Sequence, residues 1–121
     1  MRLTLVLDFS GMTYYGNIPN TPFPPDPRVD EAHFDIGEDM MSDEWDLLDA
    51  EFVQPLDKLC DLTLDYGDVD YLDAEKCANA EIWLRKKLDE GVSEQLAPVF
   101  EKLLEYATRA KELKTGVVVE L

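Results

Sequence analysis

Large apolar residues occupy every second position near the N-terminus, at Leu3, Leu5, Leu7 and Phe9. A period of two predicts a β-strand with one strongly apolar face. Residues 12–15 follow a Ser-Gly pair and are expected to form the return arm of a hairpin. At the other end, residues 117–121 form a β-branched run after a glycine. Because two short strands are unstable alone, we expect these terminal strands to pair with each other.

Apolar residues later in the chain recur at spacings of three and four, which predicts helices. The first is expected to begin at the N-cap Ser42, with a kink or break near residues 52–54 caused by Pro55. A second should run from about Asp73 to Glu90, and a third from about Ser93 to Leu113. Residues 16–41 hold a cluster of prolines, which predicts a long irregular loop: Pro19, Pro22, Pro24, Pro25 and Pro27.

Together these elements predict an α+β fold. Its small two- or three-stranded sheet, in which the N-terminal strand pairs with the C-terminal strand, is packed by about three helices and carries the long Pro-rich loop. The 121 residues match the size of a single domain, 1–121. The two cysteines, Cys60 and Cys77, lie on apolar stripes, as is typical of reduced thiols. Without an apolar run long enough for a signal peptide or a membrane helix, we expect a cytoplasmic protein.

Charge is distributed unevenly along the chain, whose formal net charge is −16. Residues 26–75 hold 18 acidic side chains and 2 basic ones, and the remaining 71 residues hold 9 of each. The negative charge therefore belongs to one acidic segment, 26–75, inserted in an electrically balanced frame. Such a surface repels nucleic acid and anionic membranes and attracts basic proteins or cations.

Metal and catalytic signals are weak by comparison. The acidic turn 65–73 is rich in carboxylates but lacks the EF-hand pattern, with no glycine at its sixth position and no glutamate at its twelfth. His33 is the one histidine, and the serines Ser10, Ser42 and Ser93 lie in turn or cap contexts rather than in a nucleophile elbow. No catalytic residue, metal ligand set or cofactor is predicted, which favours a protein without enzymatic activity.

The leading hypothesis is a non-enzymatic protein-binding domain, of the kind found in acidic inhibitors and immunity proteins, that engages a basic protein partner. The alternatives are a Ca²⁺-responsive protein acting through the turn 65–73 and an enzyme of unknown class. A homodimer formed through a sheet edge is a further hypothesis. The residues predicted to bind the partner are Asp35, Glu38, Asp39, Asp43, Asp46, Asp65, Tyr66, Asp68, Asp70 and Tyr71.

Overall fold

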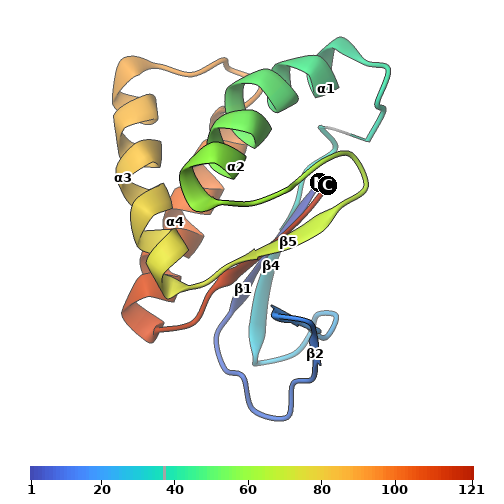
Figure 1. Ribbon diagram of the computed structural model, residues 1–121, viewed down its shortest axis with the longest axis vertical. Helices are drawn as coiled ribbons and strands as arrows, with labels where there is room; N and C mark the ends of the chain where they lie inside the picture. The colour runs from blue at the N-terminus through green and yellow to red at the C-terminus, as the bar shows by residue number, and fades with distance from the viewer. Residues whose placement is uncertain (37) are drawn as a thin grey trace.

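A four-stranded antiparallel sheet forms the centre of the protein (Figure 1). The structure, a computed structural model, describes residues 1–36 and 38–121. The strands follow the order β4-β1-β6-β5, so the first and last strands of the chain lie side by side in the middle. Their bounds are Arg2–Val6 for β1, Val29–His33 for β4, Val69–Leu72 for β5 and Val117–Glu120 for β6.

The register of the sheet places apolar residues of neighbouring strands opposite one another. Leu3 lies opposite Val119, and Leu5 lies opposite Val117. Main-chain hydrogen bonds extend this pairing to both chain ends. The N-terminal amine donates to the carbonyl oxygen of Phe34 at 3.0 Å, and the amide of Leu121 donates to that of Asp68 at 2.9 Å. The two termini therefore lie close together at one end of the sheet (Figure 1).

Helices cover one face of this sheet (Figure 1). Ser42 caps the first, its Oγ accepting a hydrogen bond from the amide of Trp45 at 3.1 Å, and Asp73 caps the next by accepting from the amide of Lys76 at 2.9 Å. The bounds are Asp43–Leu48 for α1, Asp49–Val53 for the π-helical segment η1, Gln54–Cys60 for α2, Ala74–Glu90 for α3 and Ala97–Leu113 for α4. The side chains between sheet and helices form one apolar core.

The opposite face of the sheet is covered by the segment between β1 and β4. Tyr14–Tyr15 (β2) and Ile18–Pro19 (β3) form a two-stranded hairpin, and Pro19 is buried. Thr4 and Val118, which lie opposite each other on this face, are buried as well. The sheet is therefore covered by helices on one side and in part by the N-terminal hairpin segment on the other, where Val69 is still 43% exposed.

The α+β class and the three helical regions are confirmed, but the sheet has four strands rather than two or three. Strand β4 lies inside the segment 16–41, which was expected to be irregular throughout; Gly37, in the same segment, lies outside the described residues. Residues 14–15 pair with β3 and not with β1. Strands β4 and β5 are extended because they form hydrogen bonds with β1 and β6, and not because their sequences show an apolar pattern. These two strands are the sheet edges that the predicted homodimer would use.

The helices also differ in detail from the expected pattern. The irregularity predicted near Pro55 is the π-helical segment η1, and the helix continues beyond it to Cys60. Helix α4 begins at Ala97 rather than near Ser93 and places Pro98 in its first turn, where a missing amide proton is tolerated.

Both cysteines are free and buried, and burial raises the pKa of Cys60 to about 11 and that of Cys77 to about 12. Over residues 1–36 and 38–121, each helix falls short of the length and apolar character that crossing a bilayer demands.

Gly116 lies directly before β6, where the chain passes very close to Tyr71 and Leu72 of β5. A Cβ atom here would overlap the carbonyl oxygen of Leu72 and the hydroxyl of Tyr71. Gly116→Ala should therefore lower the free energy of unfolding by about 1–3 kcal/mol, as overpacking does elsewhere. Urea denaturation measures this loss. Adding Tyr71→Phe should restore only part of it, since the carbonyl oxygen remains, and an unchanged midpoint in Gly116→Ala would contradict the packing.

Candidate functional site: an acidic face

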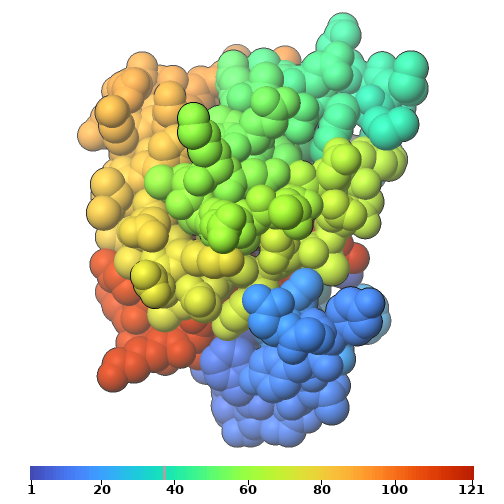
Figure 2. Space-filling view, viewed as in Figure 1, coloured from blue at the N-terminus to red at the C-terminus, as the bar shows by residue number. Residues whose placement is uncertain are grey.

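Two acidic segments that are distant in the sequence meet at one end of the protein. The loop before α1 and the turn before β5 adjoin in the space-filling view (Figure 2). Tyr66 joins them, because its hydroxyl donates a hydrogen bond to the carbonyl oxygen of Glu38 at 2.6 Å. Its ring also meets the ring of Trp45 edge-on, with centroids 5.2 Å apart. A single tyrosine thus fixes the turn against the start of the first helix.

Each segment is also ordered by its own hydrogen bonds. A carboxylate oxygen of Asp39 accepts from the amide of Met41 at 2.9 Å, and the hydroxyl of Ser42 donates to the carbonyl oxygen of Asp39 at 2.6 Å. In the turn, the amide of Asp68 donates to the carbonyl oxygen of Asp65 at 3.0 Å. Because Leu121 donates to the carbonyl oxygen of Asp68, the C-terminal end of the chain holds the turn in place.

We call this surface the acidic face, and its residues are Asp35, Glu38, Asp39, Asp43, Asp46, Asp65, Tyr66 and Asp68, all of them exposed. In the described part of the chain, none of its carboxylates lies within 4.0 Å of a lysine or arginine nitrogen. The Glu38 carboxylate lies 3.7 Å from Nε2 of His33, which carries charge only when protonated.

Acidic residues of the sheet and of its neighbouring loops are paired instead. Arg2 contacts both Glu31 and Glu120, and Arg28 holds Asp26 with two guanidinium hydrogen bonds. The carboxylates of the acidic face therefore form one region of uncompensated charge, whose negative potential attracts cationic groups.

Asp70 and Tyr71, the other two residues predicted to bind a partner, have structural positions. A carboxylate oxygen of Asp70 accepts from the amide of Thr63 at 3.2 Å, which ties the chain before the turn to β5. Tyr71 is buried beside Gly116, and burial raises the pKa of its hydroxyl to about 12. Neither side chain contributes to the acidic face.

Asp57 was not among the residues predicted to bind a partner, yet the folded structure raises the pKa of its carboxyl group. Its carboxylate accepts a hydrogen bond from the amide of Leu64 at 3.0 Å and is only partly exposed. Burial raises the pKa of Asp57, and the nearby charges of Asp70, Asp49 and Asp65 raise it further, against the opposing effect of the Leu64 amide. This carboxylate is destabilised in its charged form by the folded structure around it.

The acidic turn does not gather its carboxylates around a central point. Asp73 caps α3 and Asp70 accepts from Thr63, so both side chains are directed to backbone amides. Over residues 1–36 and 38–121, the group that brings three ligand atoms within 4.8 Å of one another is His33, Asp35 and Glu38, all exposed. A calcium site needs six to eight oxygen ligands, and the turn 65–73 does not provide that arrangement.

His33 has no serine partner among the described residues. The hydroxyls of Ser10, Ser42 and Ser93 donate instead to Asp8, to the carbonyl oxygen of Asp39 and to Glu51. Ser10 and Ser42 therefore act in a turn and a cap, Ser93 links to a distant helix, and among the described residues the serines form no nucleophile–base pair with His33.

Comparison of the chain with protein-family models, with curated proteins and with solved structures found no match.

Tyr66→Phe isolates the hydrogen bond that joins the two acidic segments, because the ring that packs on Trp45 is retained. We expect the variant to lose about 0.5–1 kcal/mol of unfolding free energy. Amide exchange at Met41 and Ser42 should accelerate, since the loop before α1 loses its anchor. Hydrogen exchange with mass spectrometry measures this change. Tyr15→Phe, at a tyrosine that is 78% exposed, is the matched control, and equal exchange in both variants would contradict the role of Tyr66.

Asp57→Asn tests the repulsion inside the acidic segment. The folded-state pKa of Asp57 is raised above the ordinary value of 3.8, so its ionisation lowers stability as the pH rises through that folded pKa. Asparagine retains an acceptor for Leu64 and removes the charge. The variant should be more stable than the wild type at pH 7, by about 0.5 kcal/mol in low salt, and the difference should vanish below about pH 3. Melting curves at several pH values measure it; an advantage independent of pH would contradict the assignment.

Proposed function

We propose that the protein is a non-enzymatic binding protein whose acidic face engages a basic surface of a partner protein. The observation that supports this most directly is the link from Tyr66 to Glu38, which joins two acidic segments into one surface. Seven carboxylates lie on that surface without a lysine or arginine partner in the described part of the chain. Repulsion among like charges opposes folding, which favours a role for them in binding.

A protein that normally binds nucleic acid is the partner class that suits this surface best. Its lysines and arginines are arranged to meet phosphates, and clustered carboxylates present negatively charged oxygens to the same side chains. Long-range attraction between the two surfaces accelerates association and makes it sensitive to salt. Tyr66 adds a half-exposed aromatic ring at the centre of the face, a residue type enriched in protein interfaces. An inhibitor or immunity-type role follows if the partner's nucleic-acid site is the surface covered.

Charge reversal on the acidic face tests this proposal. Asp35, Asp46 and Asp68 are exposed and make no side-chain hydrogen bond within the described residues. The combined variant Asp35→Lys, Asp46→Lys and Asp68→Lys should fold and should lose capture of the partner from an extract of the native host. The wild type should capture a basic protein at low salt and release it as the salt concentration rises past roughly 0.3 M, where screening shortens the Debye length.

The matched control reverses the same number of charges elsewhere on the surface, at Asp89, Glu101 and Glu112, which are also exposed. This control should capture the partner as the wild type does. The proposal would be contradicted if both triple variants lost the partner equally, or if the wild type at low salt captured no basic protein.

A further inference from the structure

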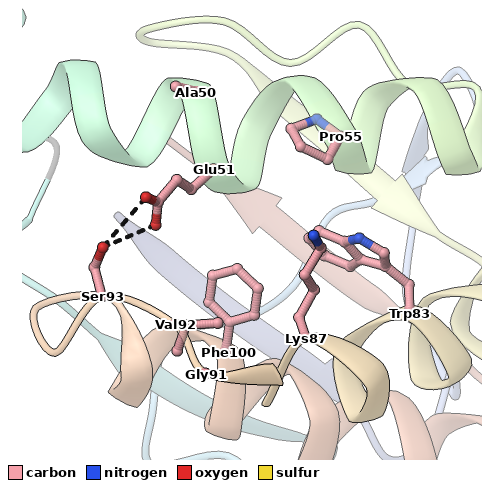
Figure 3. A pocket seen from close by; sticks show the side chains of 9 residues that line it. All are labelled: Ala50, Glu51, Pro55, Trp83, Lys87, Gly91, Val92, Ser93 and Phe100. Atoms are coloured by element: carbon pink, nitrogen blue, oxygen red, sulfur yellow. Dashed lines mark hydrogen bonds between the residues drawn. The ribbon is translucent and has the colours of Figure 1, made fainter. Parts of the chain in front are cut away.

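A pocket of about 530 Å³ lies between the first helical region and the connection from α3 to α4 (Figure 3). Pro55 and Val92 line it from opposite sides, and Trp83 forms an aromatic wall that is supported by the fully buried ring of Phe100, with ring centroids 5.4 Å apart. Phe52 packs against both rings, at 6.3 Å from Trp83 and 5.4 Å from Phe100. The volume of the pocket matches that of sites for small ligands, and its lining is both polar and apolar.

Two opposite charges lie across this pocket. The carboxylate of Glu51 is held by the hydroxyl of Ser93, which donates to its two oxygens at 3.0 and 3.2 Å. Lys87 comes from α3, and Figure 3 shows it on the other side of Phe100 from Glu51. Within residues 1–36 and 38–121, neither Glu51 nor Lys87 forms an ion pair, so both charges are open to a ligand.

The π-helical segment adds a hydrogen-bond acceptor beside Glu51. In an α-helix the carbonyl oxygen of Ala50 would accept from the amide of Gln54, but that amide donates to Asp49. In a π-helix it would accept from residue 55, which is a proline and has no amide proton. The Ala50 carbonyl thus lacks both of its regular helical donors, and Ala50 and Pro55 both line the pocket. Such π-helical segments occur frequently at functional sites.

We propose that this pocket binds a free α-amino acid with a large apolar side chain. The ligand's ammonium group would lie against Glu51 and its carboxylate against Lys87, while its side chain packs on Trp83. Charge-assisted contacts to the two groups on the ligand's α-carbon give orientation, and the indole of Trp83 gives apolar contact area. A zwitterion also has no net charge, so the −16 net charge of the protein does not repel it as it would a simple anion.

Titration of the ¹⁵N-labelled protein with L-phenylalanine tests the proposal. Saturable shifts are expected at the indole N–H of Trp83 and at the amide of Ser93, with a dissociation constant between about 1 μM and 1 mM. N-acetyl-L-phenylalanine lacks the ammonium group and L-phenylalaninamide lacks the carboxylate, so each should bind at least about tenfold more weakly. Glu51→Gln and Lys87→Gln should each weaken binding of L-phenylalanine by about tenfold or more.

Lys86→Gln and Glu90→Gln are matched controls, because both residues are exposed on α3, the helix that carries Lys87, and neither lines the pocket. They should bind like the wild type. The charge-reversed acidic-face variant should also bind L-phenylalanine normally, which separates this proposal from the partner-binding one. The proposal is overturned if L-phenylalanine, L-leucine and L-methionine all fail to saturate the protein at about 10 mM. Binding of either blocked analogue as tight as that of L-phenylalanine, or shifts confined to other surfaces, would overturn it as well.

Discussion

The structure depends on the antiparallel pairing of β1 with β4 on one side and β6 on the other. This pairing places Leu3 and Leu5 beside Val119 and Val117, and so builds the apolar face on which the helices pack. It also determines where the charged turn lies, because β5 pairs with β6 and the amide of Leu121 holds the carbonyl oxygen of Asp68. Without the C-terminal strand, the turn that carries Tyr66 would have no fixed position relative to α1. The acidic face is thus a consequence of the sheet topology.

The acidic residues divide into two populations with different physical roles. Those on the sheet and its neighbouring loops are neutralised by arginines, as in the contacts of Arg2 with Glu31 and Glu120. Those of the acidic face have no such partners among the described residues. Unpaired surface charges of one sign contribute repulsion rather than stability. Their presence on one surface is the basis of the binding role that we propose for it.

Local patterns allowed much of the fold to be predicted, but not its contacts between distant segments. The alternation that begins at Leu3 and the N-cap Ser42 are local patterns, and the structure has a strand and a helix start there. Strand β1 nevertheless ends at Val6 rather than Phe9, and it is buried on both faces. Strand β4 has the sequence Val-Asp-Glu-Ala-His, whose weak apolar pattern gives no strand signal; its pairing with β1 makes it extended. The site was predicted by composition alone, so Tyr71 was grouped with Tyr66 although packing buries one and leaves the other at the surface.

The pocket could not be predicted from the sequence, for a different reason. Trp83 and Phe100 belong to separate helices, and nothing in their spacing shows that they meet. The opposed charges of Glu51 and Lys87 arise from the same helix packing. The sequence predicted an irregularity near Pro55. It did not predict a π-helical segment or the carbonyl group that this segment leaves without a helical donor.

Thermal melting at low ionic strength tests whether the carboxylates of the acidic face are retained in spite of their effect on folding. Neutralising Asp35, Asp46 and Asp68 to asparagine should raise the melting temperature by a few degrees, since an isolated repulsion is worth about as much as a surface ion pair. Neutralising Asp89, Glu101 and Glu112 instead, in the balanced part of the surface, should change it much less. An equal shift in both variants, or a lower melting temperature after neutralising the acidic face, would contradict the account.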